Sequence, residues 1–193
     1  SILTGSLQLS GTEYLAFGRF DVAIPSYVLF IDGDGTGSGQ IKIAGQTYSL
    51  PYSGSFPSGS SINIEAIADT DSKFSEWSNG ISGSTNPTTI TLTENMNITA
   101  NFIKTYTLSV NQIGDGQVSI NGSPQTIPYN AIFDVGTEVT IEAVELTGSV
   151  FTQWTGDLTG KTNPNNITIN SNKTITANFV PLRSLAVNIS STN

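Results

Sequence analysis

Residues 74–102 read FSEWSNGISGSTNPTTITLTENMNITANF, and residues 151–179 read FTQWTGDLTGKTNPNNITINSNKTITANF. The two stretches align at a shift of 77 residues, which places Trp77 over Trp154. The alignment extends backwards, and about 28 of 66 paired positions from Gly37 onward are identical. A repeat of this length and similarity predicts two tandem copies of one structural unit.

The pattern within each copy is that of β-strands. Apolar and polar residues alternate with a period of two, as in Ile62, Ile64 and Ala66, and turn-forming clusters recur every eight to twelve residues. No stretch has the period of an amphipathic helix. The fold class we expect is all-β, with two small antiparallel β-sheet or sandwich domains. Strands are predicted in the first copy at about 27–31, 39–44, 46–50, 61–68, 73–77, 88–92 and 96–103.

The duplication divides the chain into four parts. Leu185 and Val187 match Leu108 and Val110, so the sequence resumes the pattern of a repeat near its end. The N-terminal residues alternate like strands but have no place in a complete repeat. The expected parts are a strand segment at 1–24 (the end of a preceding repeat or a donor strand), repeats at 25–103 and 104–180, and the start of a further repeat or a terminal strand at 181–193.

The composition excludes several classes of function. The 15 acidic and 7 basic residues give a net charge of -8, which argues against a nucleic-acid partner. No run of about 18 apolar residues is present, so we expect no membrane span. The chain has no Cys and no His, which removes imidazole catalysis and the usual zinc sites. We therefore expect no cofactor and no enzymatic activity.

The segment IDGDGTGSGQ (residues 31–40) raises the question of calcium. Asp32 and Asp34 fit the first and third positions of an EF-hand loop, but the twelfth position is Ile43 instead of Glu. The second copy has Asn111 in place of Asp32. We interpret the segment as a turn that opens each repeat, and Asp32 and Asp34 remain weak metal candidates.

For several other residues, both a functional and a structural role can be considered. Trp77 and Trp154 could stack on sugars, but their place beside a recurring Phe favours core anchors, together with Phe102 and Phe179 at the ends of the repeats. Glu65 and Glu142 could suggest acid–base chemistry, but alternation places both on the solvent face. Isopeptide bonds between Lys and Asn are a further hypothesis. Its candidates are Lys42, Lys73, Lys104, Lys161 and Lys173.

Five Asn-x-Ser/Thr sequons permit N-glycosylation, although a chain in which Ser, Thr and Asn make up about a third of residues contains several by chance. The candidate sites are Asn97, Asn121, Asn166, Asn172 and Asn188.

The combined pattern F-x-x-W, G-x-T-N-P, I-T and I-T-A-N-F resembles the divergent internalin-type B-repeat family of bacterial and archaeal surface proteins. The resemblance covers roughly residues 27–103 and 104–180. It implies small β-rich modules in tandem on secreted or cell-wall proteins, which act as stalks, spacers or adhesive surfaces. The family supplies no catalytic residues.

We therefore expect a non-catalytic, extracellular structural or adhesive module of a cell-surface protein or fibre. One alternative is a filament subunit whose terminal strand adds to the sheet of a neighbouring copy. Another is a carbohydrate-binding module that uses exposed Tyr and Trp faces to bind surface glycans. A monomeric native protein would argue against the filament, and a row of aromatic side chains on one face would favour the glycan module.

Overall fold

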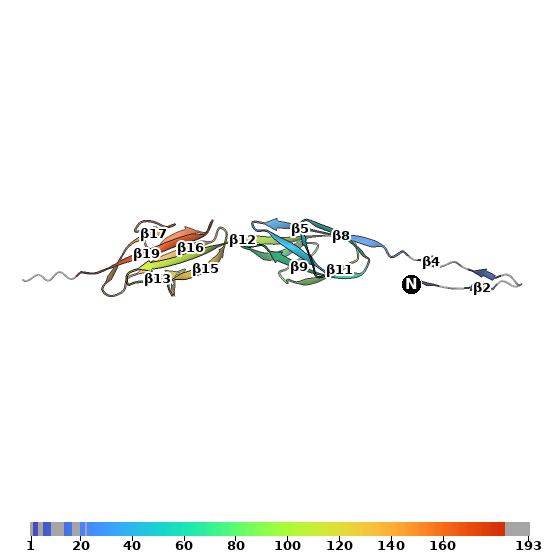
Figure 1. The fold of residues 1–193 in the computed structure, drawn as a ribbon, viewed down its shortest axis with the longest axis horizontal. Coiled ribbons are helices and arrows are strands. Elements are labelled where there is room, and N and C mark those ends of the chain that lie inside the picture. Colours follow the sequence, from blue (N-terminus) through green and yellow to red (C-terminus); the bar gives the residue numbers. More distant parts are fainter. Residues whose placement is uncertain (1, 4–5, 9–13, 17–19, 22, 184–193) are drawn as a thin grey trace, which may run out of the picture. The chain divides into compact units, whose positions relative to one another are not determined.

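The computed structural model describes residues 2–3, 6–8, 14–16, 20–21 and 23–183. These residues form strands and no helix, and 67% strand content confirms the expected all-β class. Figure 1 shows the strands in chain order. The first four are short and pair with one another: β1 (Ile2–Leu3) with β4 (Phe20–Asp21), and β2 (Ser6–Gln8) with β3 (Tyr14–Ala16). A role for this segment as a donor strand stays a prediction.

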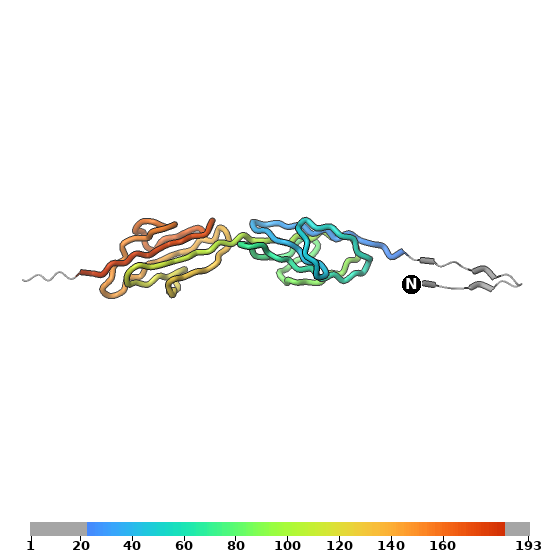
Figure 2. Tube along the Cα trace, viewed as in Figure 1, coloured from blue at the N-terminus to red at the C-terminus, as the bar shows by residue number. Residues whose placement is uncertain are grey.

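The chain separates into two compact units. Unit 1 comprises residues 1–33, 40–67 and 76–100, and unit 2 comprises residues 34–39, 68–75 and 101–193. Two loops of the first repeat therefore belong to unit 2. The colours of Figure 2 follow the chain from one repeat into the next.

Unit 1 contains two groups of paired strands. Strand β5 (Ser26–Gly35) pairs antiparallel with β8 (Tyr52–Pro57). The other sheet has the order β11-β9-β6-β7, formed by Thr88–Leu92, Ser60–Ala68, Gly39–Ile43 and Gln46–Ser49. Strand β10 (Ser72–Asn79) pairs with β12 (Met96–Ile113), and β12 neighbours β5, so both belong to the group of β5 and β8. Side chains of both groups are buried, among them Leu29, Ile41, Ile64, Trp77 and Ile98.

Unit 2 repeats this plan. Its first sheet has the order β14-β13-β16-β18, formed by Ser123–Gln125, Gln117–Ile120, Glu138–Val144 and Asn165–Thr168. In the second, β12 pairs antiparallel with β15 (Tyr129–Asp134) and parallel with β19 (Lys173–Pro181), which pairs with β17 (Ser149–Gly156). The parallel pair was not predicted. One core cluster joins the two sheets as a sandwich: Leu108, Val110, Val118, Ile120, Val139, Ile141, Ala143, Trp154, Ile167, Ile169, Ile175, Ala177 and Phe179.

Two strands differ from the sequence prediction. The stretch YSGSFP forms β8, although its Ser, Gly and Pro content is typical of a turn. It becomes a strand because it pairs with β5. Tyr52, Gly54 and Phe56 then alternate with more exposed residues, and Pro57 stands at the strand end, where a missing N–H is tolerated. Strand β12 continues to Ile113 because β10, β15 and β19 pair along it, and residues 96–113 contain no Gly or Pro that would prevent this pairing.

Each repeat also contains a tight hairpin at matching positions. Ala44 and Gly45 between β6 and β7 have φ values of 47° and 89°, and Asn121 and Gly122 between β13 and β14 have 49° and 75°. Two successive positive φ values are typical of the type I′ turn, whose twist matches that of the paired strands. The hairpins hold β6 and β13 in register with their partners.

Candidate functional site

Each repeat is closed by a tryptophan that lies in the core. Trp77 and Trp154 are 2% and 0% exposed. Their indole Nε1 atoms donate to the carbonyl oxygens of Thr85 and Thr162, each at 3.0 Å. The ring therefore fills the sandwich while its polar edge fastens the loop that leads to the Asn-Pro pair. Neither indole offers a free face for a sugar.

The asparagine of each Asn-Pro pair bonds both backbone groups of one strand residue. Asn163 Oδ1 accepts from Ala143 N at 2.8 Å, and Asn163 Nδ2 donates to Ala143 O at 2.7 Å. Asn86 makes the same two bonds to Ala66, both at 2.8 Å. The amide thus continues the ladder of the sheet beyond its last strand pair. The sequence predicted a turn here, and the recurrence of Asn, instead of any turn residue, is the signal for this second role.

Asn163→Ala is expected to lower the free energy of unfolding of unit 2 by about 2–3 kcal/mol, because it leaves the N–H and C=O of the buried Ala143 without partners. Denaturant unfolding followed by Trp154 fluorescence, in a Trp77→Phe background, measures the loss. Asn163→Asp is the matched control, because it keeps the acceptor and loses the donor. Its free energy of unfolding should lie between that of the unchanged chain and that of Asn163→Ala. Equal stability of all three proteins would show that the amide has no structural role.

A second pair of asparagines caps the strand that begins each repeat. Asn95 Oδ1 accepts from Val28 N at 2.8 Å, and Asn172 Oδ1 accepts from Thr107 N at 2.9 Å. These bonds tie the loop before the ITANF strand to the start of the same repeat. They give Asn172 a structural role in addition to its place in a sequon.

The four sequon asparagines that the structure describes, Asn97, Asn121, Asn166 and Asn172, are all exposed. Asn121 Oδ1 accepts from Thr140 N at 2.9 Å, while Asn166 Nδ2 donates to Glu138 Oε1 at 2.5 Å. A glycan attaches to the amide nitrogen, so this bond disfavours Asn166. Asn188 lies outside the described residues, and glycosylation of any site stays a prediction.

The segment with Asp32 and Asp34 opens its repeat as part of β5. Each carboxylate accepts from the next backbone N–H, Gly33 N at 2.8 Å and Gly35 N at 2.7 Å. Among residues 2–3, 6–8, 14–16, 20–21 and 23–183 no group of three acidic side chains lies close enough to hold a metal ion. The local bonds explain the carboxylates without calcium.

The glycines of this segment permit a close approach of two backbones. A Cβ on Gly35 would lie 2.1 Å from Phe102 O, and one on Gly114 would lie 2.3 Å from Phe179 O. Gly114 therefore occupies the place of Gly35, whereas the sequence alignment put it opposite Gly37. The two extra residues of the first repeat follow Gly35, and the recurring element is a contact between this glycine and the closing Phe.

The remaining acidic and aromatic candidates lie at the surface. Glu65 Oε2 lies 3.2 Å from Lys42 Nζ, while Glu142 Oε2 accepts from Ser119 Oγ at 3.2 Å. Tyr48 and Tyr52 form the nearest thing to an aromatic platform, with ring centroids 4.8 Å apart. Burial, and then the neighbouring Tyr48, raise the pKa of the Tyr52 phenol above its usual value.

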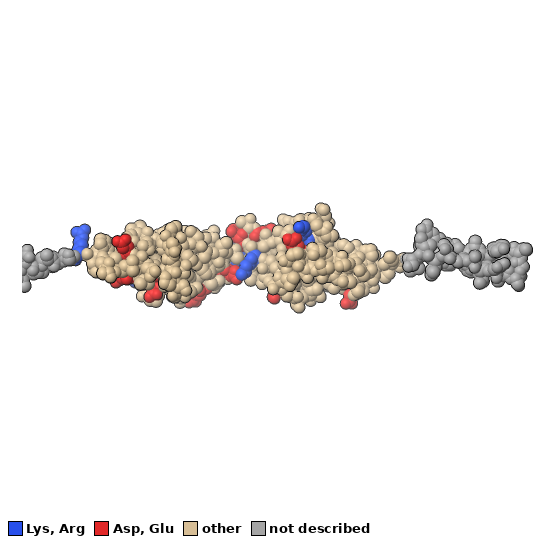
Figure 3. Space-filling model, turned by 90° about the horizontal axis from the view of Figure 1, so that it is seen from below, with Lys and Arg blue, Asp and Glu red and all other residues tan. Residues whose placement is uncertain are grey.

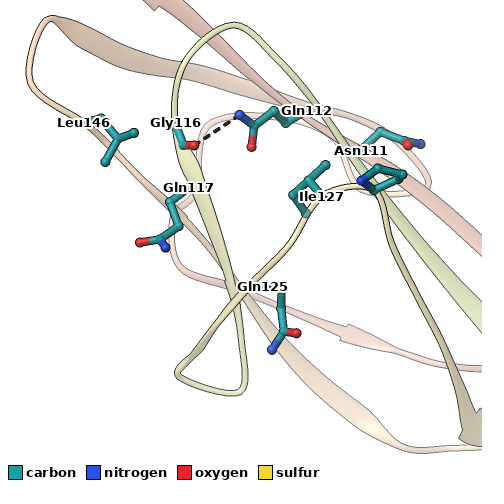
Figure 4. Close-up of a pocket in the computed structure, with 8 residues that line it drawn as sticks. Asn111, Gln112, Gly116, Gln117, Gln125, Ile127 and Leu146 are labelled. Carbon is teal, nitrogen blue, oxygen red and sulfur yellow. Dashed lines mark hydrogen bonds between the residues drawn. The ribbon is translucent and has the colours of Figure 1, made fainter.

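A pocket of about 500 Å³ lies in unit 2. Figure 4 shows its lining, in which Gln112 donates to Gly116 O at 3.1 Å. None of the lining residues is aromatic or charged: they are Asn111, Gln112, Gly116, Gln117, Gln125, Ile127, Pro128 and Leu146. The first repeat has Tyr48 where Gln125 stands and Asp69 where Leu146 stands. The lining is therefore particular to the second repeat.

Both repeats thus share one set of closing contacts, made by Trp, the Asn-Pro amide, the capping Asn and the Gly–Phe pair. A family model described as the divergent InlB B-repeat domain matches residues 33–105 and 106–182. The chain belongs to this family. Membership confirms the resemblance predicted from the sequence.

The other comparisons add little to the B-repeat assignment. The chain is similar to the major pilin protein (T-13) from Streptococcus pyogenes serotype GAS131465, with 7% identity over 95% of this chain and 99% of that chain. The TM-score of 0.28 is too low to indicate a shared fold. The comparison with curated proteins gave no match. No helix among the described residues is long and apolar enough to cross a membrane.

Proposed function

We propose that this pair of B-repeats is a non-catalytic structural spacer of an extracellular surface protein. The observation that carries the proposal is that both repeats have the same closing contacts and also end in the same backbone bond. Thr105 N donates to Asp71 O where the first repeat ends, and Leu182 N donates to Gly148 O where the second ends, both at 2.8 Å. A repeat that ends with the same backbone contact in each copy is suited to a tandem array.

The surface of the chain supports the same role. Charged residues make up 11% of the chain, against roughly a quarter in an average soluble domain. On the face drawn in Figure 3, the charged side chains form a few small groups, some with red and blue side by side, and most of the described surface is uncharged. A spacer needs a folded domain with a hydrated surface and no catalytic centre. Hydroxyl and amide side chains provide this hydration.

The extracellular location is tested on intact cells that produce the native protein. Antibodies raised against the second repeat are expected to label these cells, and external protease should remove the label. Lysed cells provide the control for antibody access. Labelling that appears only after lysis would contradict the proposed location.

Strand addition between copies is the second candidate, and the edge strands favour it. Strand β8 pairs only with β5, and among the described strands β15 pairs only with β12. Ile132 on β15 is 72% exposed. An open strand edge is a template for another strand. Negative-stain microscopy of the native protein distinguishes the two candidates, because filaments would favour strand addition and separate particles would exclude it.

Carbohydrate binding is the weaker alternative. Both tryptophans are buried, and no aromatic side chain lines the pocket of unit 2. The Tyr48–Tyr52 pair is the aromatic surface that a glycan site could use in the first repeat, and the second repeat has Gln125 in place of Tyr48.

A further inference from the structure

Four apolar side chains are exposed together where the second B-repeat ends. Ile113, Leu146, Val180 and Leu182 are 62%, 47%, 48% and 62% exposed. Backbone pairing places them around the end of β19: Ile113 is in register with Asn178, two residues before Val180, Leu182 N donates to Gly148 O, and Ser149 N donates to Leu146 O. Val150, which pairs with Val180, completes the group. We name these five residues the end surface.

Three of the five matching positions of the first repeat are charged. Asp34, Asp69 and Lys73 stand where the second repeat has Ile113, Leu146 and Val150. All three charged residues belong to unit 2, within the loops 34–39 and 68–75. The ends of the two repeats therefore differ in charge at three places, whereas Val180 and Leu182 correspond to the uncharged Ile103 and Thr105.

Unit 2 also shows what lies against the charged version of this surface. Lys73 Nζ lies 2.8 Å from Asp134 Oδ1. The next residue, Val135, donates its N–H to Lys104 O at 2.9 Å. The end of β15 therefore contacts the start of β10, which carries Lys73, and the turn that follows β15 is bonded to Lys104. This turn is the part of a following repeat that meets the end of the preceding one.

The backbone at the end of the second repeat is arranged for the same contact. The Leu182–Gly148 bond has the length and the place of the Thr105–Asp71 bond. The sequence then continues with Leu185 and Val187 at the positions of Leu108 and Val110. The equivalent of Asp134 in the first repeat is Pro57, so the turn accepts an uncharged residue at this position.

We infer that the end surface binds the turn of a further B-repeat that carries an apolar residue in place of Asp134. The inference rests on the proposed role as a tandem module. Burial of the end surface removes apolar area from water, which favours docking. An Asp facing Val150 would instead lose water without gaining a cationic partner. The residue at position 73, or at the equivalent position 150, thereby selects which repeat follows. Lys73 favours a following repeat that carries Asp, and Val150 favours one that carries an apolar residue.

The first test uses the existing chain. Lys73→Val leaves Asp134 facing an apolar side chain and is expected to lower the unfolding midpoint of unit 2 by a few degrees. Lys73→Val combined with Asp134→Val recreates the apolar pairing and should recover most of this loss. Asp134→Val alone is the second single variant, and the positions are coupled if the double variant is more stable than the sum of the two single effects predicts. Simple addition of the two single effects would overturn the selection rule.

The second test adds a repeat. Residues 184–193 are replaced by a copy of residues 107–183, with Asp or Val at the copy's equivalent of Asp134. Each version is made with Val150 and with Val150→Lys. Hydrogen exchange of the β19 amides reports docking on the end surface.

Protection of β19 is expected to be about tenfold stronger for Val facing Val150 than for Asp facing Val150, and Val150→Lys should reverse the order. Equal protection in all four proteins, relative to the two-repeat chain, would leave docking intact but overturn the selection rule. No added protection in any of them would overturn docking itself. Neither outcome would bear on the extracellular location, which the labelling of intact cells tests separately.

Discussion

Trp154→Ala is expected to lower the free energy of unfolding of unit 2 by about 4 kcal/mol, the largest effect of any single truncation in this repeat. The indole is 0% exposed and packs against Phe151, with ring centroids 5.0 Å apart. Removal of a buried Trp side chain loses its transfer free energy and leaves a cavity, and costs about 3–5 kcal/mol in known cores. It also leaves Thr162 O without the indole donor. Denaturant unfolding followed by circular dichroism measures the loss.

Trp154→Phe separates packing from hydrogen bonding in this prediction. The variant keeps an aromatic ring in the core but removes the Nε1 donor to Thr162 O. We expect it to lose about half as much stability as Trp154→Ala. If Trp154→Ala changes stability by less than about 1 kcal/mol while binding to a glycan array is lost, the residue would be a ligand platform instead of a core anchor.

Gly114→Ala is expected to lower the free energy of unfolding of unit 2 by about 3 kcal/mol or more. The new Cβ would lie 2.3 Å from Phe179 O, which is a backbone atom and moves only with β19. The positive φ of 82° adds a cost of about 1–2 kcal/mol for any L side chain. Thermal unfolding of the variant measures both effects together.

Gly136→Ala is the matched control, because Gly136 also has a φ of 82° but a Cβ added there would meet no atom within 4 Å. It should show the conformational cost alone, about 1–2 kcal/mol. The difference between the two variants isolates the close approach of Gly114 to the closing strand. Equal losses would show that this approach has no importance for stability.

The sequence predicted the repeats and the all-β class because the period of two and the 77-residue duplication are visible in the sequence itself. Neither feature depends on which strands pair with one another. Strand β8 was missed because its Ser, Gly and Pro residues favour turns, and only its pairing with β5 makes it a strand. The length of β12 was missed because pairing partners in two repeats, not a local signal, keep residues 96–113 extended.

The site was less accessible from the sequence than the fold. The Asn-Pro pair predicted a turn, but its two bonds to Ala143 depend on residues 20 positions apart. The Gly35–Phe102 approach was likewise hidden, since a glycine alone does not say which backbone comes near it. The exposed apolar residues at the end of the second repeat needed the structure, because alternation alone does not distinguish an outward apolar residue at an end from one in the core.

Single-molecule force extension of the native chain tests most directly whether it is a structural spacer made of two B-repeats. Held by handles at its two ends, the chain should unfold in two steps, one for each repeat. Each step should add less than about 28 nm of contour length, because a fully extended repeat of this size measures about 28 nm and its folded length is subtracted from that value. Trp154→Ala should lower the force of one step and leave the other unchanged. A chain that extends without resistance, or that unfolds in one step of twice this length, would contradict the account.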